Sequence, residues 1–301
     1  MNSPTEARNP RTRHIDELST SEILRLISDE DRQVPVAVAA VLDQLSIAVD
    51  LAAHALDTGS KVHYFGAGSS GRIGLLDAAE LRPTFSAPDG WFCAHLAGGP
   101  RALQHAVEAA EDNDAAGEAE AHECVRAGDV TLGLTASGGT PYVIGALRGT
   151  RAKGGHTVLV TANPQAVNSD VEVLIGLDTG PEVIAGSTRM KAATAQKLVL
   201  NAFSTAVMIK TGRVYSNLMV SLVATNAKLR IRTVSILQEA TGMPQSECQA
   251  ALTAADGELK TALVSLLGNA SIADARHALR SCQDRVRDAL ALLSTPEAHA
   301  S

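Results

Sequence analysis

Short apolar segments alternate with helix-patterned segments through the middle of the chain. The apolar segments are four to seven residues long, and several are followed by a stretch whose apolar residues recur every three or four positions. Such alternation with short connections favours a mostly parallel sheet with helices on both faces. We therefore predict a doubly wound α/β fold, with strands over residues 62–65, 92–96, 130–135, 157–161 and 171–177 and helices over 73–81, 101–111 and 142–153.

The N-terminal region predicts an extended arm followed by a capped helix. Residues 1–19 are polar and rich in arginine. Ser19 or Thr20 can cap a helix that runs to about Asp29, and Glu22 stands where a capping box needs its acid.

Further helices are expected on both sides of the α/β region. Between residues 35 and 56, apolar residues spaced by three and four predict one buried helical stripe. Later helical patterns cover residues 188–210, 217–241, 245–254, 258–267 and the stretch from 272 onward. We expect three parts: an N-terminal arm with helices (1–58), an α/β domain with its long helices (59–241) and a C-terminal three-helix unit (242–301).

Composition excludes several classes of function. The 301-residue chain is long enough to bury a substantial core, and its net charge of −7 argues against a general nucleic-acid binder. The first residues lack an apolar signal core, and no apolar run reaches 18 residues, so we expect no membrane association. Four scattered cysteines without a Cys-x-x-Cys pair indicate reduced thiols in the cytoplasm, and the histidine spacing predicts no metal site.

Two loops combine hydroxyl groups with glycines where an expected strand passes into an expected helix. They span residues 66–71 and 135–140, and within them Gly68, Ser69, Ser70, Ser137, Gly138 and Thr140 are candidate ligand-binding residues. Backbone N–H groups at a helix N-terminus, together with hydroxyls, suit an anion or a sugar. The first loop also matches Gly-x-Gly-x-x-Gly, but the acid that a nicotinamide site needs after the next strand is absent. Two purely structural turns are the alternative, although they explain a matched pair less well.

A third segment, residues 186–191, places Ser187, Arg189 and Lys191 at the start of a long helix. Cations oppose the helix dipole at that end unless an anion or acid is near, so the segment is either part of a binding site or a solvated helix start.

Acidic side chains complete the set of candidates. Glu80 lies on the first site helix, and Glu108, Glu111 and Asp112 are expected on the next. Asp77 and Glu80, three residues apart, share a helix face, so one can shift the pKa of the other. Spacing alone does not decide whether Glu80 and Glu111 face each other.

Together these motifs resemble the N-acetylmuramic acid 6-phosphate etherase family, within the wider group of sugar isomerase-type phosphosugar-binding proteins that includes the glucokinase regulatory protein. The resemblance covers nearly the whole chain from about Thr20. It rests on the motifs at 66–72, 77–80, 105–112, 137–143, 186–197 and 217–220. Gly139 stands where the family often has arginine, Leu81-Arg82 where it has Cys-Pro, and Ala193 where it has glycine.

The resemblance implies a sugar isomerase-type fold with a C-terminal helical bundle of the ubiquitin-associated type. It implies cleavage of N-acetylmuramic acid 6-phosphate to N-acetylglucosamine 6-phosphate and D-lactate in peptidoglycan recycling, by a homodimer without metal or organic cofactor. Glu80 matches the family's principal catalytic acid and Glu111 its second catalytic glutamate. The first serine loop would hold sugar hydroxyls and the second the phosphate.

Two other functions share parts of this pattern. A non-catalytic phosphosugar sensor would keep the serine loops but would not need both glutamates. An aldose–ketose isomerase would need a base beside C2 but no acid for a substituent at C3. The presence of both Glu80 and Glu111 favours the etherase.

Overall fold

The computed structural model describes residues 4–222 and 227–295. The chain divides into two compact units. The first combines residues 1–79 with 89–205, and the second combines residues 80–88 with 206–301. The expected division into 1–58, 59–241 and 242–301 stays a prediction.

The N-terminal segment forms three short 3₁₀ turns, Pro4–Glu6, Pro10–Thr12 and Ile15–Glu17, before the helix α1 (Thr20–Asp31). Ser19 caps α1, and its side chain and that of Glu22 form the predicted capping box.

The expected helix over residues 35–56 is two helices, α2 (Gln33–Ala39) and α3 (Leu42–Asp57). They are separated at Val41, whose φ of −116° is not helical. Several β-branched valines precede the break, and such residues lower helix propensity. The buried stripe itself is confirmed, because Leu45, Val49 and Leu56 are all buried.

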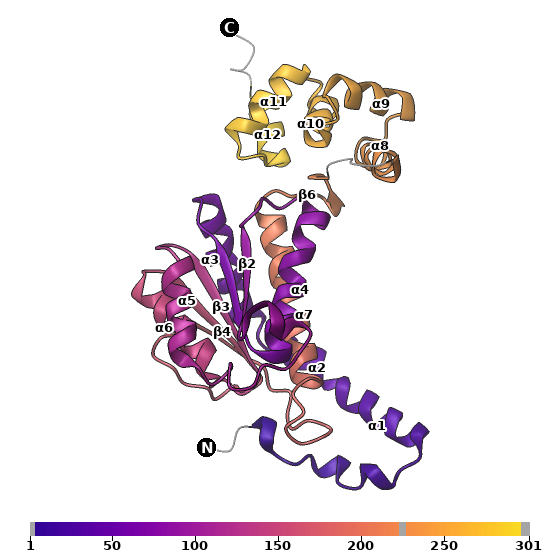
Figure 1. Ribbon diagram of the computed structural model, residues 1–301. Helices are drawn as coiled ribbons and strands as arrows, with labels where there is room; N and C mark the ends of the chain where they lie inside the picture. Colours follow the sequence, from indigo (N-terminus) through magenta and orange to yellow (C-terminus); the bar gives the residue numbers. More distant parts are fainter. Residues whose placement is uncertain (1–3, 223–226, 296–301) are drawn as a thin grey trace. The chain divides into compact units, whose positions relative to one another are not determined.

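A five-stranded sheet forms the centre of the first unit (Figure 1). Its strands are β1 (Val62–Gly66), β2 (Phe92–Leu96), β3 (Val130–Thr135), β4 (His156–Thr161) and β5 (Val173–Gly176). They are all parallel, in the order β2-β1-β3-β4-β5. The predicted parallel, doubly wound architecture is therefore confirmed.

Helices pack on both faces of the sheet, and alternate residues of β1 show which ones. Tyr64 lies 6.3 Å, between ring centroids, from Phe203 of α7 (Lys191–Lys210). Phe65 points to the other face, 6.1 Å from Tyr142 of α6 (Pro141–Ala152). On that second face α6 packs against α5 (Asp114–Cys124), while α4 (Gly68–Phe85) follows β1 and approaches Tyr64 through Gly74.

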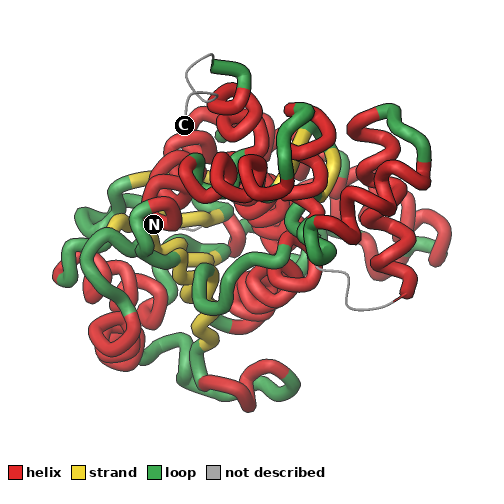
Figure 2. The backbone as a smooth tube through the Cα atoms, turned by 90° about the horizontal axis from the view of Figure 1, so that it is seen from above, coloured by secondary structure: helices red, strands yellow, loops and turns green. Residues whose placement is uncertain are grey.

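The second unit contains a short hairpin and a bundle of helices, so that strands make up little of it (Figure 2). The hairpin pairs β6 (Val214–Tyr215) with β7 (Leu218–Met219). The helices are α8 (Ala227–Thr241), α9 (Gln245–Ala254), α10 (Leu259–Gly268), α11 (Ile272–Ser281) and α12 (Val286–Leu293).

Two details of this unit differ from expectation. The helix expected from residue 217 was wrong at its start, because Ser216 has a φ of 54° and turns the chain into the hairpin with Asn217. The stretch from 272 onward contains two helices where one was expected. They are separated by Gln283 and Asp284, which both have positive φ.

Among the helices within 4–222 and 227–295, none alone has the length and apolar character needed to cross a bilayer; the bent pair Thr20–Ala39 and Leu42–Asp57 meets that test only when its parts are counted together.

Candidate active site

A cavity of about 450 Å³ lies where the loops that follow β1 and β3 meet. In a doubly wound sheet with this strand order, the chain leaves β1 and β3 toward opposite edges, and the carboxyl ends of these two strands border a crevice where ligands bind. The lining comes from the first unit alone: Thr5, Glu6, Ala67, Gly68, Ser69, Ser70, Glu111, Asp112, Leu134, Thr135, Ala136, Ser137, Gly139, Thr140, Pro141, Gly186 and Thr188.

The first loop turns from β1 directly into α4 because its glycines leave no room for side chains. A Cβ on Gly66 would lie 2.6 Å from the backbone nitrogen of Gly71, and one on Gly71 would lie 2.4 Å from Cδ1 of Leu96. The helix begins at Gly68, so the N–H groups of Gly68 and Ser70 lie in a first turn that offers them no acceptor within the helix. This turn presents backbone donors and serine hydroxyls to the cavity.

The second loop is held by its own hydroxyl groups. The Thr135 and Thr140 hydroxyls are 2.7 Å apart, and the N–H of Gly138 donates to Thr135 Oγ1 at 3.3 Å. Gly138 has a φ of +83°, and a Cβ there would lie 3.1 Å from Thr161 Oγ1, so it shapes the loop without lining the cavity. Thr140 precedes the first residue of α6. A second helix N-terminus therefore borders the cavity.

Glu111 lines the cavity from a turn, not from a helix. The helix expected over residues 101–111 was wrong: a 3₁₀ turn covers Gly99–Leu103, and α5 starts only at Asp114. The start is fixed by Asn113, whose side chain accepts a hydrogen bond from the N–H of Ala116. The carbonyl of Glu111 accepts the N–H of Tyr142 at 3.0 Å, which joins this turn to the start of α6.

Glu80 lies on α4 with an exposed side chain, and it belongs to the second unit, whereas the cavity lining belongs to the first. Asp77, one turn earlier, is 5% exposed. Tyr64 Oη and Ser204 Oγ donate to its two carboxylate oxygens at 3.0 and 3.1 Å. Burial raises the pKa of Asp77 to about 6, against the lowering effect of these two hydrogen bonds. Burial, and not the neighbouring Glu80, is thus the cause of the shift.

The start of α7 contains its own counter-charges. The backbone N–H groups of Lys191 and Ala192 each donate to a carboxylate oxygen of the buried Glu182 at 2.9 Å. The Lys191 ammonium, 0% exposed, lies 2.7 Å from the Glu30 carboxylate, which is also buried. For Lys191, the protein's own acids therefore resolve the conflict between the cation and the helix dipole.

The third segment, residues 186–191, contributes less to the cavity than predicted. Lys191 is a buried structural cation and does not line the cavity, contrary to expectation, and Ser187 and Arg189 are also outside the lining that the described residues form. Thr188 and Gly186 do contribute to it.

The N-terminal arm contributes residues to the cavity that no sequence motif indicated. Thr5 is buried, its carbonyl accepts the N–H of Gly186 at 3.1 Å, and Thr5 and Glu6 both line the cavity. Only the fold brings this segment to the cavity. Asp112, expected beside Glu111, adds a further carboxylate.

The arrangement suits a polyhydroxylated anion. Two helix N-termini and several hydroxyls supply donors for a phosphate and for sugar oxygens. The carboxylates of Glu6, Glu111 and Asp112 supply groups that can move protons. A cavity with donors on two sides and carboxylates at its border can bind and chemically change a phosphorylated sugar.

Comparisons with known proteins agree with this geometry. Residues 44–150 match the family model of the glucokinase regulatory protein N-terminal SIS domain. The chain is 58% identical to an N-acetylmuramic acid 6-phosphate etherase of Thermobifida fusca, over 89% of this chain and 88% of that protein. It is 47% identical to the etherase of Pectobacterium atrosepticum, over 95% of both. A phosphoheptose isomerase structure from Francisella tularensis, 16% identical, shares the fold with a TM-score of 0.51, over 64% of this chain and all of that one.

Proposed function

The chain belongs to the N-acetylmuramic acid 6-phosphate etherase family, and from that premise we propose that it cleaves the lactyl ether of N-acetylmuramic acid 6-phosphate as a carbon–oxygen lyase. The products are N-acetylglucosamine 6-phosphate and D-lactate, and the reaction serves peptidoglycan recycling and amino-sugar catabolism. The observation that carries the proposal is the cavity between the loops after β1 and β3, which combines Ser70, Ser137 and Thr140 with Glu111.

We propose that the second loop binds the phosphate and the first loop the sugar hydroxyls. Ser137 and Thr140 lie beside the N-terminus of α6, where the helix dipole favours negative charge. Ser69 and Ser70 lie in the first turn of α4 and offer hydroxyls and backbone donors. Glu111 lies in a turn, and its backbone carbonyl accepts a hydrogen bond from the N–H of Tyr142 at the start of α6. A bound phosphate beside α6 would therefore hold the sugar close to a carboxylate.

Elimination is the route that this chemistry favours. An ether resists direct displacement because its alkoxide leaving group is strongly basic. In the ring-opened sugar, the C1 aldehyde acidifies the C2–H bond, and a base can remove that proton. The lactyl oxygen at C3 then leaves with the electron pair of the C3–O bond when an acid protonates it. Water adds across the resulting double bond and restores a hydroxyl at C3.

We assign the two proton transfers to Glu80 and Glu111. Glu111 removes the C2 proton, and Glu80 protonates the departing lactyl oxygen. In the hydration step Glu80, now a carboxylate, takes a proton from the incoming water, and Glu111 returns a proton to C2. General acid or base assistance of this kind contributes about 10²–10⁴ in rate for each group. The family resemblance supports the assignment of Glu80, and the lining of the cavity supports that of Glu111.

Release of D-lactate from N-acetylmuramic acid 6-phosphate, followed by coupled enzymatic detection, tests the function. In H₂¹⁸O, elimination and hydration put the label on the C3 hydroxyl of the sugar. Label in the lactate would contradict the route, because it would mean that water attacks the lactyl carbon. Absence of turnover by folded protein would contradict the function itself.

Ser137→Ala tests the phosphate subsite. Loss of one hydrogen bond to a charged phosphate is worth about 1.5–3 kcal/mol, so KM should rise about 10- to 100-fold with a smaller change in kcat. Ser169→Ala, at an exposed serine in the loop before β5, is the matched control. An unchanged KM for Ser137→Ala would refute the assignment of the second loop.

We further propose that the enzyme acts in the cytoplasm and as a homodimer. All four cysteines are free thiols, which suits a reducing compartment.

The homodimer is supported by exposed apolar side chains. Val36 and Ile47 are large apolar side chains with 70% and 52% of their surface exposed, and a second copy of the chain could cover them. Light scattering on the eluting protein gives the oligomeric mass, and a monomer at micromolar concentration would contradict the dimer.

A further inference from the structure

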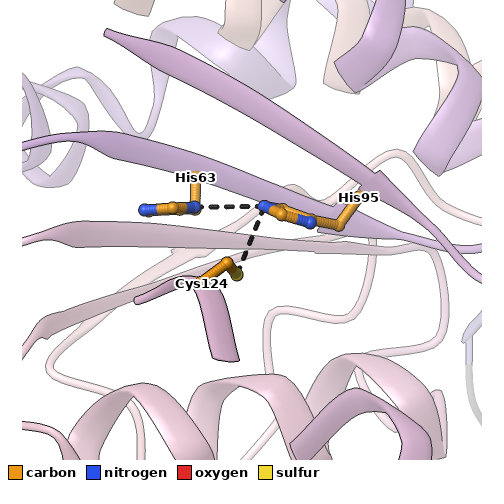
Figure 3. A group of neighbouring side chains, drawn as sticks. All are labelled: His63, His95 and Cys124. Atoms are coloured by element: carbon orange, nitrogen blue, oxygen red, sulfur yellow. Dashed lines mark hydrogen bonds between the residues drawn. The ribbon is translucent and has the colours of Figure 1, made fainter. Parts of the chain in front are cut away.

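Three potential metal ligands converge on the α5 side of the sheet, among residues that do not line the cavity (Figure 3). His63 comes from β1, His95 from the edge strand β2, and Cys124 is the last residue of α5. His63 Nδ1 lies 3.1 Å from His95 Nε2, and Cys124 Sγ lies 3.7 Å from the same His95 nitrogen. All three donor atoms lie within 4.8 Å of one another.

The other nitrogen of each imidazole faces a carboxylate. His63 Nε2 lies 3.2 Å from Asp129 Oδ2, and His95 Nδ1 lies 3.0 Å from Glu120 Oε1. Tyr142 Oη donates to the second oxygen of Glu120 at 2.6 Å and fixes that carboxylate in turn. Metal-binding histidines commonly donate their outer N–H to a carboxylate in this way, because the bond sets the tautomer and the orientation of the ring.

When both rings donate a single N–H to the outer carboxylates, the two inner nitrogens are both acceptors. A neutral imidazole carries one N–H, so a ring that donates it outward keeps a lone pair on its inner nitrogen. His63 Nδ1 and His95 Nε2 then meet lone pair to lone pair at 3.1 Å. A metal cation between the two nitrogens can accept both lone pairs.

We propose that His63 Nδ1, His95 Nε2 and Cys124 Sγ bind a zinc ion. In tetrahedral zinc with Zn–N near 2.0–2.1 Å and Zn–S near 2.3 Å, two ligand nitrogens are about 3.3 Å apart and a nitrogen and a sulfur about 3.5 Å apart. The structure has 3.1 and 3.7 Å for these pairs. Two imidazoles and a thiolate form a donor set that selects zinc-like ions over magnesium or calcium.

Access and charge balance are both compatible with the ion. His95 is 13% exposed on an edge strand and Cys124 is partly exposed, so an ion can enter from solvent. On binding, the Cys124 thiol releases its proton to water as the Zn–S bond forms, and a water molecule completes the fourth position. The bound ion would link β1, β2 and the end of α5, and β1 leads directly into the first serine loop.

The test uses the full chain stripped of metal with a strong chelator and titrated with Co²⁺ as a spectroscopic probe. We expect one Co²⁺ per chain to produce the visible bands of a tetrahedral site and a near-ultraviolet thiolate-to-cobalt band, and Zn²⁺ to displace both. Cys124→Ser should remove the thiolate band, whereas Cys282→Ser, a matched change in the second unit, should keep it. Glu120→Gln should weaken the affinity about 10- to 100-fold.

Two results would overturn the proposal: absence of any cobalt spectrum in the wild-type chain, or a thiolate band that persists in Cys124→Ser. Should that variant fail to fold, X-ray absorption on zinc-loaded wild-type protein decides without a substitution. One sulfur near 2.3 Å among nitrogen and oxygen neighbours supports the site, and a shell without sulfur refutes it.

Discussion

Replacement of Asp77 by asparagine should stabilise the first unit at neutral pH more than at pH 5. Asp77 is buried between Tyr64 and Ser204, and burial raises its pKa from 3.8 to about 6. A raised folded-state pKa means that the folded chain holds the proton more tightly than the unfolded chain. The contribution of this group to stability is therefore complete below about pH 4 and is lost as the pH rises to about 6.

The size of the effect follows from the shift. About two pKa units correspond to a loss of about 3 kcal/mol between acid and neutral pH. Roughly 1.4 kcal/mol of that loss falls between pH 5.0 and 7.5. An asparagine keeps an oxygen for the Tyr64 hydroxyl and presents its amide to Ser204, and it does not ionise. The advantage of Asp77→Asn over wild type should therefore grow by about 1.4 kcal/mol from pH 5.0 to 7.5.

Urea unfolding followed by the fluorescence of Trp91 measures this difference. Trp91 is the single tryptophan of the chain and belongs to the first unit. Asp178→Asn, the same substitution at an exposed aspartate after β5, is the matched control. The reasoning is refuted if the advantage of Asp77→Asn stays constant between the two pH values or falls.

Two further substitutions test the packing around the site. Lys191→Met should destabilise the first unit by about 1–3 kcal/mol, because the buried Glu30 carboxylate loses its ammonium partner and keeps Arg11, at 2.9 Å, as a cation; no measurable loss in urea unfolding would contradict the structural role of the pair. Gly117→Ala should cost at least about 3 kcal/mol, because overpacking against backbone is poorly relieved. The new Cβ would meet the Tyr142 carbonyl oxygen at 1.9 Å. Gly139→Ala meets nothing within 4 Å and should leave the urea midpoint unchanged; equal midpoints for both alanine variants would refute the close packing of α5 on α6.

The sheet could be predicted because each strand carries its own signal. Val62–Gly66 and Val130–Thr135 are short, buried on both faces, and followed at once by helix-starting loops. Parallel strands end at one edge of the sheet, so the strand pattern placed both serine loops at that edge; that the loops are neighbours follows from the strand order β2-β1-β3 of the structure. The Ser19–Glu22 capping box is equally local, and for that reason it was predictable.

The errors arose where distant residues decide the local structure. The partners of Lys191 are Glu30 and Glu182, and no spacing rule links an acid 161 positions away to a helix start. Residues 101–111 contain enough alanine and glutamate to suggest a helix, but Asn113 caps the helix that actually forms, α5. The carbonyl of Glu111 instead accepts a hydrogen bond from the N–H of Tyr142 at the start of α6.

The same limit applies to the proposed zinc ligands. His63, His95 and Cys124 are separated by about thirty residues each, so no ligand-spacing motif could reveal them, and the absence of a metal was the natural expectation. The register that pairs Phe65 with His95 brings β1 and β2 together, and α5 then ends beside them.

Exchange at C2, followed together with lactate release in Glu80→Gln and Glu111→Gln, tests the assigned roles most directly. In D₂O with N-acetylmuramic acid 6-phosphate, we expect Glu80→Gln to incorporate deuterium at C2 while it releases no lactate, because its base is intact and its acid is not. Glu111→Gln should do neither. Lactate release near the wild-type rate by either variant, or deuterium incorporation by Glu111→Gln alone, would contradict the division of labour between the two carboxylates.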